Sequence, residues 1–110
     1  MAELDDLKHR LRDFALARDW EQFHTPKNLA MALVAEAAEV VEHFQWLTAA
    51  ESQALDPSKR AEVALEMADV LLYLVMLADQ LEVDLADVAH HKINLNEKRF
   101  PPPPRPQERL

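Results

Sequence analysis

No glycine occurs among the 110 residues of this chain. Walker-type phosphate loops and dinucleotide-binding fingerprints both need glycine where the backbone approaches a phosphate, so both motifs are excluded. Tight hairpin turns are disfavoured for a related reason, because their central residues adopt positive φ angles. The absence of glycine therefore predicts an all-α protein, and 110 residues suit one compact domain.

Composition and charge narrow the function classes further. The chain has no cysteine, which excludes disulfides, thiolate zinc sites and cysteine nucleophiles. Its formal net charge of −8 argues against a nucleic-acid partner, although a divalent metal can still let an acidic site bind a nucleotide. The longest apolar run, Val70 to Ala78, is too short to cross a membrane, and no signal peptide is visible. We therefore expect no membrane partner and a cytoplasmic location.

Hydrophobic spacing predicts four long helices and one short one, the elements of a four-helix-bundle-like protomer. The long helices are expected from about Leu4 to Ala17, from Pro26 to about Trp46, from about Ser58 to Leu81, and from Asp84 to near Phe100. A short helical turn or loop is expected between Thr48 and Leu55. These elements predict a single domain over residues 1–100 and an extended proline-rich tail over 101–110. Such a tail is either a disordered end or a polyproline ligand, and we expect the first.

Two pairs of acidic residues stand at the same helical spacing. Glu36 and Glu39 lie three residues apart in the second helix, as Glu66 and Asp69 do in the helix from Ser58. Each pair borders an apolar stripe, so antiparallel packing of the two helices would direct four carboxylates into one pocket. Hard divalent cations such as Mg²⁺ or Mn²⁺ prefer oxygen ligands of this kind. Glutamates at this spacing are also common on solvated helix faces, and spacing alone does not separate the two readings.

Other candidate site residues are less specific taken alone. Lys92, Asn96 and Arg99 share one face of the last helix and could clamp phosphate, or could simply complement the helix dipole. Aromatic side chains and a histidine could line a base pocket by stacking, although each is equally suited to the core or its rim. These are Trp20, Phe23, His24, Trp46 and Tyr73.

Two segments of the chain, with its closing motif, resemble a known family. They are Arg18–Trp46, which contains the "RDWEQFH" loop, the E-x-x-E pair and "FQW", and Glu66–Leu85, which contains the E-x-x-D pair. With the closing K-x-x-x-N-x-x-R-F-P, they resemble the MazG-like all-α NTP pyrophosphatase superfamily, and within it the dCTP pyrophosphatases. The resemblance covers about Leu4 to Pro101. It implies Mg²⁺-dependent hydrolysis of a deoxynucleoside triphosphate, such as dCTP, to the monophosphate and pyrophosphate.

The resemblance also implies roles for individual residues. Metal ligands would be Glu36, Glu39, Glu66 and Asp69, with Mg²⁺ as the ion and Mn²⁺ as a substitute. The base and sugar pocket would comprise Trp20, Glu21, Gln22, Phe23, His24, Trp46 and Tyr73. Lys92, Asn96 and Arg99 would contact the phosphates. We expect Glu36, with Glu39 beside it, to take part in catalysis, and Glu36 to act as the general base toward water.

The chain departs from the family pattern at two places. The dCTP-specific relatives have a substrate-contacting histidine on the first helix, and the matching position here is Leu11. This departure puts the base preference in doubt. The family often has glycines near the E-x-x-E pair, and here the matching residues are Ala35 and Ala38, which changes little.

Assembly and alternative functions complete the expectations. The apolar residues on several helices suggest surface that a monomer cannot cover, and the family resemblance implies pockets completed across subunits. We therefore expect a homotetramer built from dimers. One alternative is a non-enzymatic helical interaction module, which needs no metal. Another is a di-iron or di-manganese redox bundle, but its usual Glu-x-x-His motifs do not lie beside the four carboxylates.

Overall fold

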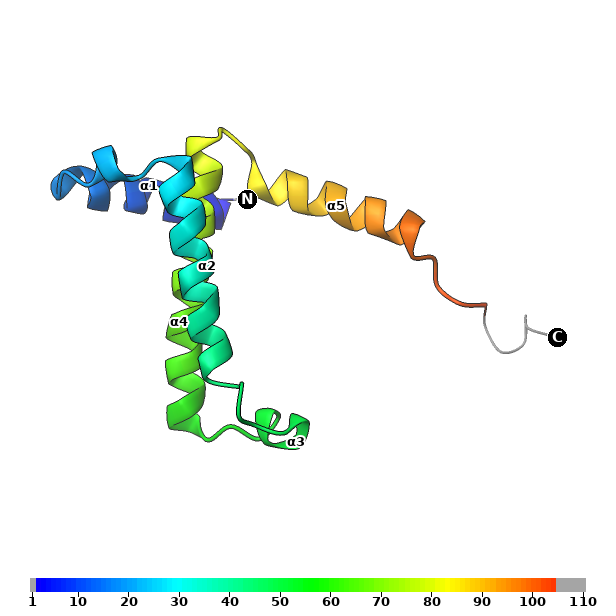
Figure 1. The fold of residues 1–110 in the computed structure, drawn as a ribbon. Coiled ribbons are helices and arrows are strands. Elements are labelled where there is room, and N and C mark those ends of the chain that lie inside the picture. The colour runs from blue at the N-terminus through cyan, green and yellow to red at the C-terminus, as the bar shows by residue number, and fades with distance from the viewer. Residues whose placement is uncertain (1, 105–110) are drawn as a thin grey trace.

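The computed structural model describes residues 2–104 and confirms the all-α prediction, since every regular element in this range is a helix (Figure 1). The helices are α1 (Ala2–Ala17), the 3-10 turn η1 (Glu21–Phe23), α2 (Pro26–Glu42), α3 (Ala49–Ser52), α4 (Pro57–Gln80) and α5 (Leu85–Arg99). The five α-helices are the four long helices and the short one that the sequence predicts, and the η1 turn was not predicted. Residues 101–104 are outside any helix, and the rest of the predicted tail lies outside the described residues.

Local capping explains where the long helices begin. The Thr25 side chain accepts a hydrogen bond from the backbone N–H of Asn28, and Pro26 occupies the first turn of α2. Asp84 caps α5 in the same way through the N–H of Asp87. Each cap satisfies a backbone donor that has no partner within the helix.

The predicted end of α2 at Trp46 is wrong, because the helix ends at Glu42. The backbone N–H groups of His43 and Phe44 bond to carbonyls three residues back, at 3.2 and 2.9 Å, which tightens the last turn. Thr48 and Glu51 then form a capping box that begins α3. The chain between these helices is therefore a set of turns that carries Trp46 clear of the helix.

The helices α2 and α4 run side by side in opposite directions, and α1 crosses this pair where α2 begins and α4 ends (Figure 1). Apolar residues meet at the crossing, where Leu29 of α2 is 1% exposed and Val75 of α4 is also buried. Arg12 of α1 holds Asp79 of α4 with two hydrogen bonds, one of them 2.8 Å long. This bidentate contact fixes α1 on the helix pair.

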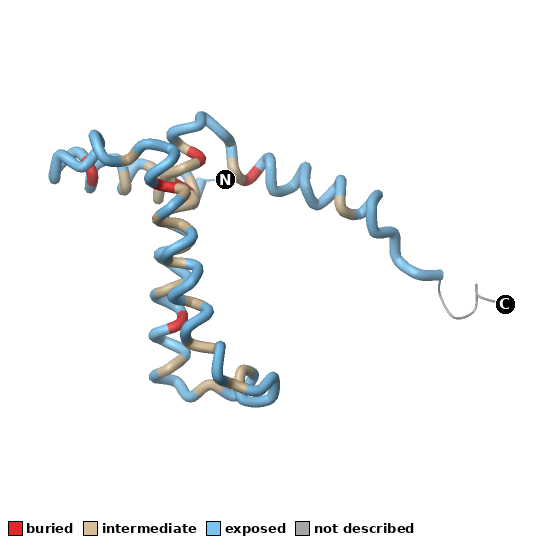
Figure 2. The backbone as a smooth tube through the Cα atoms, viewed as in Figure 1, coloured by how far each residue is buried: buried red, intermediate tan, exposed pale blue. Residues whose placement is uncertain are grey.

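The last helix, α5, leaves the body beyond its first turn, as Figures 1 and 2 show. The radius of gyration is 18.5 Å, whereas a compact chain of this length has about 13 Å. Figure 2 shows few buried positions, and Leu29 is the one large side chain of the described residues that is less than 2% exposed. A single chain thus leaves much apolar surface exposed. Among residues 2–104, no helix combines the length and apolar character needed to cross a membrane.

Candidate functional site

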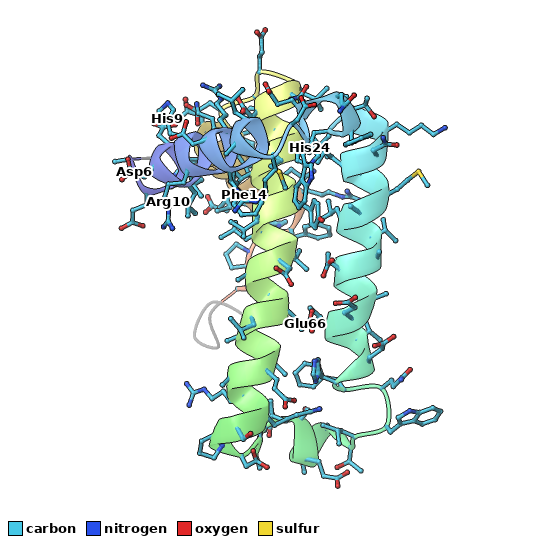
Figure 3. The ribbon with its side chains drawn as sticks, turned by 90° about the vertical axis from the view of Figure 1, so that its left-hand side faces the viewer. Asp6, His9, Arg10, Phe14, His24 and Glu66 are labelled. Atoms are coloured by element: carbon cyan, nitrogen blue, oxygen red, sulfur yellow. The ribbon has the colours of Figure 1, made fainter. Side chains whose placement is uncertain are left out.

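Three glutamates from two helices come together midway along the α2–α4 pair. Glu36 and Glu39 project from α2, and Glu66 projects from α4. One carboxylate oxygen from each can be chosen so that all three lie within 4.8 Å of one another. Figure 3 shows Glu66 on the side of α4 that faces α2. Antiparallel packing produces this meeting, as the matched spacing of the two acidic pairs predicts.

Burial and mutual repulsion raise the pKa values of two carboxyl groups in this cluster. The pKa of Glu36 is raised, first by its partial burial and then by the neighbouring carboxylate of Glu39. The pKa of Glu66 is also raised, first by a hydrogen bond shared with Glu39 and then by burial, while His43 opposes the shift. Carboxylates held this close disfavour one another's charged forms. Without a cation, the cluster is therefore electrostatically strained.

The oxygen atoms of the cluster fit a divalent cation. Glu36 Oε2 and Glu66 Oε2 are buried and have no hydrogen-bond partner within the described part of the chain. Buried polar atoms of this kind normally have a partner, so an unpaired oxygen calls for a donor or an ion. Oxygen donors at this separation suit Mg²⁺ or Mn²⁺. The three glutamates could therefore hold one such ion.

Asp69, the fourth predicted ligand, lies one turn further along α4. Its charge contributes to the raised pKa of both Glu36 and Glu66, so Asp69 interacts electrostatically with the cluster. It is exposed, and it also lines an adjacent hollow between α1 and α4. Asp69 thus belongs to both features.

This hollow has a volume of about 370 Å³ and is mostly apolar. Its lining comprises Leu7, Arg10, Leu11, Phe14, Trp20, His24, Asp69, Leu72, Tyr73 and Met76. The Phe14 ring meets the Trp20 ring edge-on, with centroids 5.6 Å apart, and the Arg18 guanidinium stands 3.6 Å from the Phe14 centroid. Figure 3 shows Phe14 and His24 gathered where α1 meets the helix pair. Aromatic rings beside an acidic rim can accept a flat ligand by stacking.

Three predicted pocket residues, Trp20, His24 and Tyr73, line this hollow. The α1 residues Leu7, Arg10 and Phe14 were not among the predicted pocket residues, although the resemblance places Leu11 at a substrate-contacting position. Phe14 remains 46% exposed, which a helical pattern cannot reveal without the position of the neighbouring helix.

Other predicted residues are not brought to the hollow in a single chain. Glu21 lines a separate depression beside Arg12, and Phe23 is 58% exposed. Gln22 bonds instead to the Asp19 carbonyl, at 3.1 Å. Trp46 is 86% exposed and is separated from Trp20 by the length of α2, about 25 Å for 17 residues.

The predicted phosphate clamp also lies apart from the carboxylates. Lys92, Asn96 and Arg99 belong to α5, which projects away from the α2–α4 pair in Figure 1. Their roles stay predictions, and any contact with the cluster would need another copy of the chain.

One more side chain, His43, lies beside the cluster and was not predicted. Its Nε2 atom is 3.9 Å from Glu66 Oε1. A spacing signal was present, because His43 follows Glu39 by four residues and therefore shares its helix face.

Comparisons with known proteins match both the sequence and the fold. The model of the MazG-like family matches residues 31–104. The protein dCTP pyrophosphatase 1 of Rattus norvegicus is 46% identical over 100 residues, and that of Homo sapiens is 45% identical over the same length. Each match covers 89% of this chain but 59% of the relative, so the chain spans about three fifths of these proteins. A crystal structure of a pyrophosphatase from Archaeoglobus fulgidus superposes with a TM-score of 0.85 at 37% identity, covering 91% of this chain and 94% of that one.

Proposed function

The chain belongs to the MazG-like family, and we propose that it is a nucleoside triphosphate pyrophosphohydrolase. Its substrate is dCTP or a related deoxynucleoside triphosphate, and its products are the monophosphate and pyrophosphate. One observation supports this most directly: Asp69 joins the aromatic hollow to the carboxylate cluster. A nucleoside stacked in the hollow would therefore direct its phosphates toward the carboxylates.

The carboxylate cluster supplies the catalytic groups. Glu36, Glu39, Glu66 and Asp69 hold Mg²⁺, for which Mn²⁺ can substitute. An ion held there would neutralise charge on the triphosphate and would orient it for attack by water. Glu36 accepts the proton of the attacking water.

The hollow supplies binding energy and selectivity. Trp20, His24 and Tyr73 contact the base and the sugar, together with Glu21, Gln22 and Phe23, which lie between Trp20 and His24 in the same loop. Leu11 presents an apolar wall to this hollow, in place of the histidine expected from the dCTP-specific relatives. The leucine side chain cannot hydrogen-bond to a substrate, so we expect broader base selection.

A homotetramer built from dimers completes the site. The exposed apolar residues on α2, α4 and α5 support this assembly: Met31, Val34, Val41, Leu65, Met67, Leu71, Val88, Ile93 and Leu95. In the assembly, a second subunit brings Trp46 to the base pocket, and Lys92, Asn96 and Arg99 to the phosphates. Residues 1–100 form the catalytic domain, and the protein acts in the cytoplasm.

The direct test measures phosphate release, in the presence of inorganic pyrophosphatase, from a panel of dNTPs and NTPs. We expect turnover of dCTP with Mg²⁺, no turnover with EDTA, and dCMP with pyrophosphate when the coupling enzyme is omitted. No turnover of any nucleotide under Mg²⁺ would favour a non-enzymatic helical module instead.

A matched pair of variants tests the cluster. Glu39→Gln should abolish turnover while the helical content and the oligomeric state stay unchanged. Glu42→Gln makes the same chemical change on the same helix, but Glu42 is exposed and outside the cluster, so its rate should match the wild type. Equal rates for the two variants would refute the metal-ligand assignment.

A further inference from the structure

One wall of the aromatic hollow is supplied by α1, which contributes Leu7, Arg10, Leu11 and Phe14. The facing wall is supplied by α4. The three clustered glutamates stand instead on α2 and α4, a helix pair that does not include α1. The shape of the hollow therefore depends on how α1 is seated, whereas the carboxylates are placed by the other two helices.

A bidentate contact seats α1 on α4. Arg12 Nε donates a hydrogen bond to Asp79 Oδ2 at 2.8 Å, and Arg12 Nη2 donates another to Asp79 Oδ1. Within residues 2–104, no other side-chain hydrogen bond joins these two helices. The Asp79 side chain is 17% exposed, so solvent screens the pair less than it screens a surface pair. Two parallel bonds fix the orientation of a guanidinium as well as its position, so the contact restricts rotation of α1 about its own axis.

Arg12 itself does not line the hollow. It is two residues from Phe14, which places the two side chains about 200° apart around the helix. Arg12 and Asp79 line a neighbouring depression of about 530 Å³, and this depression shares Leu11, His24 and Met76 with the hollow. The pair therefore stands behind residues that line the hollow and can act on a ligand only through them.

We propose that Arg12 and Asp79 are positioning residues, which hold α1 in the orientation that lets the hollow accept the nucleoside. This inference rests on the proposed function for the identity of the ligand. A rotation of α1 by about 10° would move an atom 5–6 Å from the helix axis by about 1 Å, enough to misplace a ring that stacks on the base. Because the carboxylates are not on α1, loss of the contact should weaken substrate binding and leave the chemical step unchanged.

Arg12→Lys tests this role, because lysine keeps the charge but has no planar fork for a bidentate contact. In the phosphate-release assay, the KM for the preferred nucleotide should rise by about 5-fold or more, while kcat stays within about 2-fold of the wild type. Asp79→Asn should raise KM by a similar factor. The double variant should raise it no further, because the two residues act as one contact.

Lys8→Met is the matched control. Lys8 stands one turn before Arg12 on the same face of α1, and its ion pair is with Asp5 of the same helix, at 3.5 Å. This variant removes a positive charge without removing a bond to α4, so its KM should match the wild type. A rise in KM equal to that of Arg12→Lys would show that KM follows the charge of this face, and would overturn the positioning role.

Calorimetry with dCMP measures binding without turnover, at a temperature at which circular dichroism shows each variant folded. The Kd should rise in Arg12→Lys and Asp79→Asn by the same factor as KM, and if Asp79→Asn does not fold, Arg12→Lys alone decides. Unchanged KM and Kd in the folded variants overturn this inference and leave the proposed function intact. A wild type that neither binds nor hydrolyses any nucleotide overturns both.

Discussion

Two of the residues in the range 2–104 of this glycine-free chain adopt the backbone conformation for which glycine is best suited. Asp19 and Glu82 each have a φ of 55° and follow the ends of α1 and α4. After α4, the N–H of Val83 bonds to the Ala78 carbonyl at 2.9 Å, and the N–H of Glu82 bonds to the Asp79 carbonyl at 3.1 Å. This pair of bonds is a Schellman motif, whose left-handed residue is usually glycine.

The free energy of unfolding should therefore rise in Glu82→Gly. The Cβ atom in a left-handed conformation costs about 1–2 kcal/mol. Glycine gives back about 0.5–1 kcal/mol through the greater freedom of the unfolded chain. The backbone effect alone is therefore a net gain of about 0.75 kcal/mol at the middle of these ranges, and about 1.5 kcal/mol at most. A gain of 1 kcal/mol corresponds to about 4–8 °C in Tm for a domain of this size.

Glu82→Ala is the matched control, because it removes the same charge but keeps Cβ. Removing an anion from the C-terminal end of α4 should itself stabilise by about 0.3–1 kcal/mol, and both variants share that gain. Urea unfolding, followed by circular dichroism at one fixed protein concentration, measures the difference between them. Equal stability of the two variants would refute the left-handed penalty at this position. At position 19, the gain in free energy of unfolding on substitution by glycine should be smaller than at position 82, because aspartate tolerates the left-handed conformation better than glutamate. Asp19→Ala is the matched control there.

Three further perturbations test the charged groups and the exposed aromatic. Glu36→Gln removes one of the repelling carboxylates, so we predict a higher Tm without metal and a smaller rise on adding Mg²⁺; a lower metal-free Tm would contradict the repulsion. Arg12 lowers the pKa of Asp79, so the stability from this pair is present above pH 3.8 and lost as the pH falls through the lowered value. Arg12→Met should therefore be less stable at pH 7 and show a shallower loss below pH 3.8, and parallel thermal-unfolding curves from pH 2 to 5 would count against the pair. Trp46→Ala should change the free energy of unfolding by no more than about 0.5 kcal/mol, because Trp46 is exposed. The same variant should bind nucleotide more weakly, as measured by calorimetry. A large loss of stability would instead show that Trp46 packs in a core.

Local signals were enough to predict the helices, because caps such as Thr25 and Asp84 act within three residues of sequence. The end of α2 was predicted less well, since the apolar pattern continues through Phe44 and Trp46 while the backbone has already turned. The pairing of Glu36 with Glu66 followed from matched spacing on antiparallel helices. The hollow was only half predicted, because its α1 wall depends on the angle at which α1 crosses α4.

The exposed apolar face of α5 and the layout of the candidate site both favour the proposed tetramer. The carboxylates and the aromatic hollow are contiguous within one chain. The residues predicted to contact the phosphates lie instead on α5, which projects away from the α2–α4 pair. The same helix exposes Val88, Ile93 and Leu95, and such a face is stabilised when another subunit covers it. In the proposed tetramer, one contact would therefore bury the apolar face of α5 and deliver the cations of Lys92 and Arg99 to an acidic site. Folding stability and catalysis then depend on the same interface, so dilution that dissociates the subunits should lower the Tm and the specific activity over the same concentration range.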